Sequence, residues 1–401
     1  MSTPKTPDDL SPSCNLCDLP AELKARIVEL CADQDERFKE WVKSRPNVGA
    51  ELKQKQTWHG RSVSALFRVS KEFNTHAAPY LFRVLKASKF DLRLKCADPT
   101  LRHLLFRELN LDSAELGKLT DIIAILPQLV GVKKLVISDK ALRQLWGGED
   151  VTFDELSLTA LTAQYSAAMF KRLCHLEEIS TTDVSLQKLS PFVVNSASTL
   201  RILRLIVPVH AIQWFSLGEI LSSSTALQEL NIDFKGDRTS SLSPDLALLR
   251  PYLSTTPPLR TLFLSSDFLN SSCFDFCTSF SSTLEHLSLT TTGGFGRGIY
   301  SGPQLTTHTF PHVTHFALED YSYTLRTLQS IRPSHFPSLA KLTFSVVDLE
   351  DWEETPFPLR ALNLSSFPTL TTLSSLAALP PSAHFASPAQ HAFACHTYSG
   401  L

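Results

Sequence analysis

The sequence has 401 residues, of which 43% are hydrophobic and 19% are charged, and its formal net charge is −2. A chain this long exceeds one ordinary compact domain unless its units repeat, and its apolar content excludes a wholly disordered protein. The small net charge gives no reason to expect nucleic acid or a membrane as a partner. With no run of about 18 apolar residues and no basic-then-apolar start, we expect a protein of the cytoplasm or nucleus.

The eight cysteines are scattered along the chain, which favours free thiols. Cys14 and Cys17 have the spacing of a zinc or redox pair, but no second pair lies nearby. We therefore expect no metal site and no cofactor. Residues 1–17, in which they lie, are expected to form a disordered tail.

The first amphipathic segment is LPAELKARIVEL, residues 19–30. A helix of this length is unstable alone in water, so it must pack on something. A charged stretch follows at 31–61, with apolar residues for a further helix and Pro46 to end it. A second helical stripe appears within 62–87, at Val63, Leu66, Val69 and Phe73.

The pattern LP-x-E-L-x-x-x-I at 19–27 and the stretch VSKEFNTHAAPYLFRVL at 69–85 together resemble the F-box, in the form that fungal proteins carry before leucine-rich repeats. The resemblance covers residues 18–87. It departs from the family at 31–61, where a standard F-box has only a short turn. This insertion either loops out or covers the docking surface, and the sequence leaves both open.

The resemblance implies a helical unit that docks on the adaptor of a cullin-RING ubiquitin ligase, while the repeats present the substrate. Carried over by position, the adaptor-facing residues are Leu19, Pro20, Leu23, Ile27, Leu30, Leu66, Val69 and Phe73. The alternative is that these helices only cap the repeats, since a first repeat exposes its leucines without a cap.

A six-residue pattern, with apolar residues at its first, fourth and sixth positions, recurs through the middle of the chain. It occurs as FRVLKA (82–87), FRELNL (106–111), VKKLVI (132–137), FDELSL (153–158), LEEIST (176–181, imperfect), LRILRL (200–205), LQELNI (227–232), LRTLFL (259–264), LEHLSL (284–289), VTHFAL (313–318), LAKLTF (339–344) and LRALNL (359–364). Successive starts lie about 20 to 32 residues apart, which is typical of a leucine-rich repeat.

The pattern predicts an α/β solenoid over 82–371, with parallel strands on the concave side and helices and loops on the convex side. Return helices are expected at 166–176, 215–221 and 243–253, the last with Ser243 as its cap. The asparagine that the repeat consensus places after each strand is absent, so the array is irregular. Residues 372–401 have no charged residue and are rich in Ala, Ser and Pro, and we expect a low-complexity tail there.

Alternate residues of each strand should face the concave side. In the first half they are Glu108, Asn110, Asp112, Lys134, Val136, Ser138, Glu155, Ser157, Thr159, Glu178, Ser180, Ile202, Arg204, Ile206, Glu229, Asn231 and Asp233. Acids outnumber bases there, which favours a basic or mixed protein segment as partner. In the second half they are Thr261, Phe263, Ser265, His286, Ser288, Thr290, His315 and Glu319. A solvated face without a ligand is the alternative.

Two loops carry further candidate contact residues. The stretch 293–302 is glycine-rich without the dinucleotide-binding spacing, and it holds Phe295, Arg297 and Tyr300. The stretch 348–354 places Trp352 among acids.

Catalytic motifs are absent: the sequence has no phosphate-binding loop, no nucleophile elbow and no HExxH. His308, His312 and His315 are close in sequence, but no cysteine or acid completes a ligand set, so we expect surface histidines. We therefore expect no catalysis, and the F-box resemblance implies a substrate receptor of an SCF-type ubiquitin ligase. A repeat scaffold whose degenerate F-box is only a cap is the alternative.

Overall fold

The computed structural model describes residues 16–43, 61–86, 106–111, 131–138, 141, 173, 175–182, 186–209, 212, 214–236, 244–266, 269–291, 305, 307–320, 330–346, 367–377 and 394–399. They belong to two compact units, Met1–Leu109 and Asn110–Leu401, which are described separately. No helix in the described part of the chain is both long enough and apolar enough to cross a membrane.

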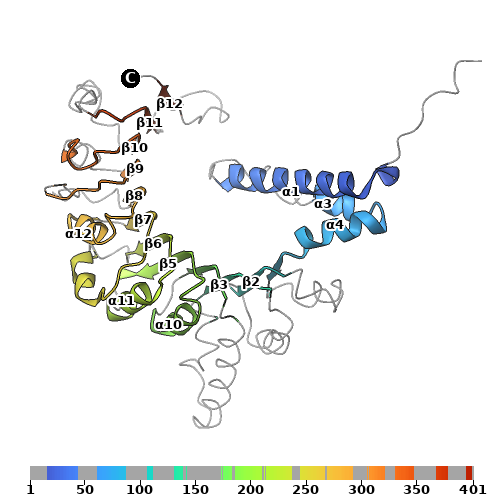
Figure 1. Cartoon of the computed structure of the whole chain (residues 1–401), viewed down its shortest axis with the longest axis horizontal. Coiled ribbons are helices and arrows are strands. Elements are labelled where there is room, and N and C mark those ends of the chain that lie inside the picture. Colours follow the sequence, from blue (N-terminus) through green and yellow to red (C-terminus); the bar gives the residue numbers. More distant parts are fainter. Residues whose placement is uncertain are drawn as a thin grey trace, which may run out of the picture. The chain divides into compact units, whose positions relative to one another are not determined.

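The first unit begins with a group of three α-helices, which we call the head (Figure 1). They are α1 (Ala21–Lys43), α3 (Arg61–Phe67) and α4 (Lys71–Leu81), preceded by a short 3-10 turn (Leu16–Asp18) and followed by strand β1 (Val84–Lys86). Helix α1 continues through the start of the predicted insertion, so residues 31–43 extend the first helix. Residues 44–60 lie outside the described residues.

The head has its own small core. Val28 and Ala32 of α1, Val63 of α3, and Phe73 and Ala77 of α4 are buried against one another. Val28 with Ala32 and Phe73 with Ala77 are pairs at i and i+4, which places each pair on one face of its helix. A side-chain cap begins α4, because the Ser70 hydroxyl accepts a hydrogen bond from the Phe73 N–H at 3.2 Å.

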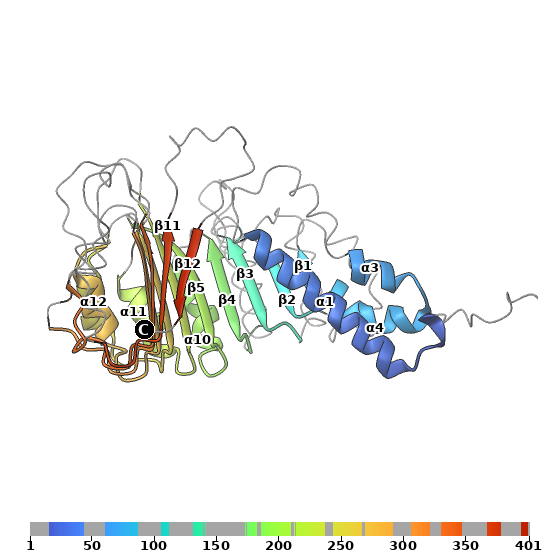
Figure 2. The ribbon, with the colours of Figure 1, turned by 90° about the horizontal axis from the view of Figure 1, so that it is seen from above.

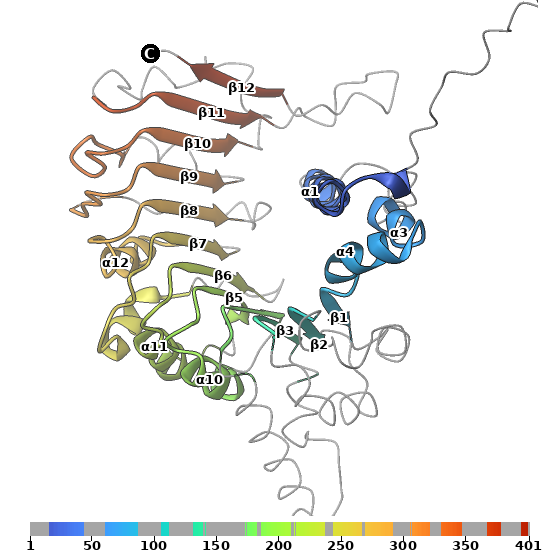
Figure 3. The same ribbon diagram turned by 45° about the vertical axis from the view of Figure 1, so that its right-hand side comes forward.

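The second unit is built on strands that follow one another in chain order (Figure 3). The strands are β2 (Glu108–Leu111), where the two units meet in sequence, then β3 (Lys134–Ser138), β4 (Glu178–Thr182), β5 (Ile202–Pro208), β6 (Glu229–Lys235), β7 (Thr261–Ser266), β8 (His286–Thr291), β9 (His315–Asp320), β10 (Lys341–Val346), β11 (Thr372–Ala377) and β12 (Ala394–Ser399). Strands β3 to β11 are parallel, and β12 pairs antiparallel with β11. We call β3 to β11 the array.

Among the described residues, return helices lie on the outer side of β4 to β8 and leave these strands on the inner side (Figures 1 and 2). They are α10 (Leu186–Asn195), α11 (Trp214–Ser223), the 3-10 helix η5 (Leu246–Tyr252) and α12 (Ser272–Thr278). The helix predicted at 215–221 is confirmed. The segment predicted at 243–253 is a 3-10 helix capped by Asp245, because that carboxylate accepts from the Ala247 N–H at 3.2 Å. Ser243 and most of 166–176 lie outside the described residues.

The backbone fixes the register of the array by one repeated contact. The carbonyl oxygen just before a strand accepts hydrogen bonds from two consecutive N–H groups of the next unit. Lys133 O accepts from Glu177 N at 2.7 Å and Glu178 N at 3.1 Å, and Arg260 O accepts from Glu285 N and His286 N at 2.8 Å each. The same double contact occurs in the array at Glu177, Arg201, Gln228, Glu285, Thr314 and Ala340, and in the first unit at Arg83, just before β1.

Side-chain hydroxyls make a second kind of link between units. The hydroxyls of Thr199, Thr283 and Thr369 donate to the carbonyl oxygens of Leu176, Leu259 and Leu339, at 3.0, 2.8 and 2.8 Å. Each threonine directly precedes a buried leucine of its own unit. Among the described residues, threonine thus supplies inter-unit bonds in an array that lacks the consensus asparagine.

Three parts of the sequence prediction need correction. Strand β3 pairs directly with β4, and β10 directly with β11, so no strand from 153–158 or 359–364 stands between them. Both of those stretches lie outside the described residues. The segment predicted to be a low-complexity tail, 372–401, contains strands β11 and β12. Pairing with β10 outweighs the composition of this segment, because Thr371 N and Thr372 N both donate to Ala340 O.

A close helix contact gives a test of the packing. A Cβ placed on Gly218 of α11 would lie 2.3 Å from the Cβ of Tyr252, at the end of η5. Alanine in place of glycine inside a helix ordinarily stabilises by about 1 kcal/mol. Here we expect Gly218→Ala to lower the free energy of unfolding by about 1–3 kcal/mol, because η5 must move away. Urea unfolding followed by circular dichroism would measure it, and a more stable variant would contradict this packing.

Candidate protein-interaction surfaces

Helix α1 carries two apolar stripes. Val28 and Ala32 point into the head core, while Leu23 and Leu30 are 51% and 52% exposed. Residues 23, 27 and 30 share one face of a helix at about 100° per residue, and Ile27 packs at the margin of the core. We call Leu23, Ile27 and Leu30 the outer stripe. Its exposed leucines are not used by the head core.

The other residues predicted to face the adaptor divide by exposure. Val69, in the turn between α3 and α4, is 43% exposed, and Pro20 is also exposed. Leu19 is half-buried, and Leu66 packs against the head core. Phe73 is fully buried in that core, so the prediction that it contacts a partner needs correction. Its place one turn after the Ser70 cap directs the ring inward, into the cluster that also contains Val28 and Val63.

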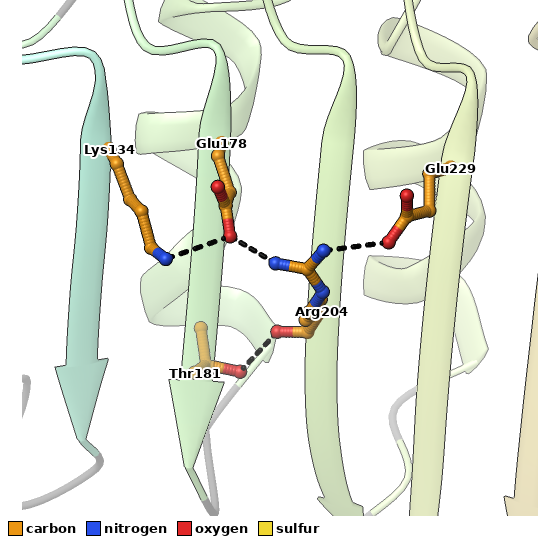
Figure 4. Close-up of polar contacts among 5 residues, drawn as sticks. All are labelled: Lys134, Glu178, Thr181, Arg204 and Glu229. Atoms are coloured by element: carbon orange, nitrogen blue, oxygen red, sulfur yellow. Dashed lines mark hydrogen bonds and ion pairs between the residues drawn. The ribbon is translucent and has the colours of Figure 1, made fainter. Parts of the chain in front are cut away.

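The concave face of the array carries a chain of ion pairs across four strands (Figure 4). The Arg204 guanidinium of β5 bonds to Glu178 of β4 and, at 2.8 Å, to Glu229 of β6. Lys134 of β3 adds a contact of 3.2 Å to Glu178. Glu178 and Glu229 are both in register with Ile202, so Arg204, two residues further along β5, reaches both. We call Lys134, Glu178, Arg204 and Glu229 the ion-pair ladder.

The ladder changes the expected chemistry of this face. Two of the acids that favoured a basic partner, Glu178 and Glu229, already have cationic partners. The predicted contact residues Glu108, Ile202, Ile206 and Asp233 are half-buried on their strands. The others, Asp112, Glu155, Phe295, Arg297, Tyr300 and Trp352, lie outside the described residues.

A second group of side chains lies on the concave face of β7 to β10. The rings of His286 and His315 are stacked, with centroids 4.1 Å apart and planes at 17°. Phe263 meets His286 edge-on at 5.2 Å, and the His315 Nε2 lies 3.1 Å from the Thr343 hydroxyl oxygen. We call His286 and His315 the histidine pair. The sequence pattern predicted that both histidines face the concave side, but it did not identify them as contact residues.

The histidine pair is held in the neutral form. Burial lowers the pKa of His315 to about 4, and His286 and Lys341 act in the same direction. Burial also lowers the pKa of His286, helped by Lys341 and opposed by Glu229. Two uncharged imidazoles can stack, whereas two imidazolium rings at this distance would repel.

A further histidine and two cysteines among the described residues are largely buried. His308 Nε2 lies 2.9 Å from the Asp275 carboxylate, and its side chain is 12% exposed, so this predicted surface histidine is largely buried. Cys273 and Cys277 of α12 are buried, and burial raises the pKa of both thiols, which disfavours the nucleophilic thiolate. Within the described ranges, no three His, Cys, Asp or Glu side chains are arranged to hold a metal ion.

No protein-family model and no curated protein matches this chain. Among solved structures, it is similar to the leucine-rich repeat-containing protein LegL7 from Legionella pneumophila, at 12% sequence identity and a TM-score of 0.37. That match covers 68% of this chain and 83% of the other. The assignment to an α/β repeat solenoid of the leucine-rich type therefore rests on the repeat spacing and the parallel pairing described above.

The ion-pair ladder should contribute more stability than an ordinary surface pair. We expect Arg204→Ala to lower the free energy of unfolding by about 1 kcal/mol, a value reduced for solvent screening because this side chain is 37% exposed. The matched control is Lys133→Ala, which breaks the more exposed pair with Glu177 and should cost less than about 0.5 kcal/mol. Urea unfolding of both variants measures the difference, and equal losses would contradict a special role for the ladder.

The histidine pair should make the array less stable in acid. A folded-state pKa below the ordinary value of 6.5 means that the unfolded chain binds more protons, so stability falls as the pH drops from about 6.5 towards 4. We expect His315→Gln to lose stability less steeply in this window, and His312→Gln, at an exposed position, to follow the native chain. Urea unfolding at several pH values tests this. Parallel curves for all three proteins would contradict it.

Proposed function

We propose that this protein is a non-catalytic interaction protein that serves as a substrate receptor of an SCF-type cullin-RING ubiquitin ligase, in the cytoplasm or nucleus. The F-box-like head docks on the ligase adaptor, and the repeats hold the substrate. The proposal joins the sequence resemblance over residues 18–87 to two surfaces, the outer stripe of α1 and the concave face of the array.

The observation that carries the proposal is the exposure of the outer stripe. Leu23 and Leu30 leave about half of each side chain in contact with solvent, although Val28 and Ala32 on the same helix complete the head core. Val69 and Tyr80 are further exposed hydrophobic side chains of the head. A helix that served only to close the head would not need this second stripe, and amphipathic helices commonly present such a stripe to a partner's groove.

The array supports the second half of the proposal. Its strands are fixed by backbone bonds and a buried leucine core, so the concave side chains project from a rigid surface. Extended concave surfaces of this kind are what repeat proteins use to bind other proteins. The ion-pair ladder offers polar contacts, and the histidine pair with Phe263 offers aromatic ones, on neighbouring strands of this face.

The test is co-purification of the full chain with the ligase adaptor. We expect the native chain to retain the adaptor and Leu23→Asp/Leu30→Asp to retain it at least about tenfold less, because two charges replace apolar side chains at the contact. These two residues are better targets than Ile27, which also packs on the head core.

The matched control is Leu248→Asp, because Leu248 of η5 in the second unit is 50% exposed. It should retain the adaptor as the native chain does. Failure of the folded native chain to retain the adaptor would contradict the receptor proposal. It would favour the alternative, a repeat scaffold whose head is only a cap.

A further inference from the structure

We propose that the concave surface formed by His286, His315 and Lys341 binds the carboxylate of an acidic side chain in an extended segment of a partner protein. We call these three residues the β8–β10 cluster. The inference rests on the proposed function, because it assigns a chemistry to the partner that the array holds.

The three side chains form one row across adjacent strands. His286 of β8 is in register with His315 of β9, which is in register with Lys341 of β10. Neighbouring strands are about 4.8 Å apart, so a single small group can contact side chains from more than one of them. All three residues are half-buried, which leaves each with a surface open to a ligand.

The charge balance of this row differs from that of the ion-pair ladder. Each charge of the ladder has an opposite partner on the next strand. Lys341 forms no ion pair with any residue that the structure describes, and its field lowers the pKa of both histidines. Glu229 is the acid that acts on His286, and it is already bonded to Arg204. The cluster therefore has an uncompensated positive charge beside two nitrogen-bearing rings.

The residues next to the cluster on β8 and β9 are small. Two positions after the histidines come the small side chains of Ser288 and Ala317, each 7% exposed, in the same register as Phe263. An extended segment can place an acidic side chain at the cluster and an apolar side chain beside Phe263. One lysine and two neutral imidazoles match a single carboxylate, whereas a nucleic-acid backbone requires several cations.

When a carboxylate binds, the histidine pair should also take up protons. The charged groups whose fields shift the pair are Lys341 on β10 and Glu229 on β6, and protonation of either histidine adds a cation beside Lys341. A bound anion removes that repulsion and raises the pKa of the pair. Affinity for an acidic segment should therefore rise as the pH falls from neutral towards about 5, while the carboxylate stays ionised.

The experiment uses the full chain, immobilised, and three pools of labelled ten-residue peptides. The pools have randomised positions drawn from phenylalanine, serine, glycine and one variable residue, which is glutamate, glutamine or lysine. We expect the glutamate pool to be retained at least about tenfold more than the glutamine pool, with a larger ratio at lower pH. Lys341→Gln should abolish the preference.

The matched control is Lys235→Gln, which removes a cation at the end of β6 on the same side of the sheet, away from the histidines. It should keep the preference for glutamate. Equal effects of the two lysine variants, or a preference for glutamine or lysine peptides, would overturn the carboxylate assignment and leave a peptide-binding array. Retention of no pool would overturn it as well, while adaptor capture by the head is measured separately.

Discussion

The carbonyl oxygen that precedes each strand determines where the next strand of the array can lie. Because that oxygen accepts from two consecutive N–H groups of the following unit, a shift of the register by one residue would lose one of the two bonds. The leucines then fall at equivalent depths, for example Leu203 and Leu205 of β5 beside Leu230 and Ile232 of β6. The side chains between them are aligned in rows on the concave face. Both interaction groups of the array exist only because these rows exist.

The ion-pair ladder and the β8–β10 cluster differ in how charge is distributed along these rows. In the ion-pair ladder, Arg204 lies two residues beyond the register position of its two carboxylates and bonds to both. The opposite charges on β3 to β6 therefore neutralise one another. In the β8–β10 cluster, two neutral histidines and Lys341 lie in a single row, and the lysine charge has no opposite partner among the residues that the structure describes. A partner that crosses from β4 to β10 therefore meets first a neutralised surface and then a cationic one.

Sequence periodicity was sufficient for the strands, since each needs only buried residues at alternate positions of a short segment. Periodicity could not predict which segments join the sheet, because that depends on pairing between units that are distant in sequence. The stretch 153–158 has the six-residue pattern, yet β3 pairs directly with β4, and β11 follows from LTTLSS (370–375), which is polar at its sixth position as LEEIST is. Glu178, Arg204 and Glu229 belong to three different units, so their ion pairs follow only once the register is known. Phe73 shares a helical stripe with Val69, but periodicity cannot tell which member of a stripe is covered by another helix.

The spacing of the strands has a consequence for how such a chain can change over generations. Strands β4 and β5 begin at Glu178 and Ile202, but β3 and β4 begin at Lys134 and Glu178, and the direct pairing is the same in both cases. Units of different length can therefore present strands with the same direct pairing. The outer side can differ in length from unit to unit where its helices do not pack as closely as α11 and η5 do, while the concave side changes mainly by single substitutions. The two sides of one repeat are thus exposed to different kinds of mutation.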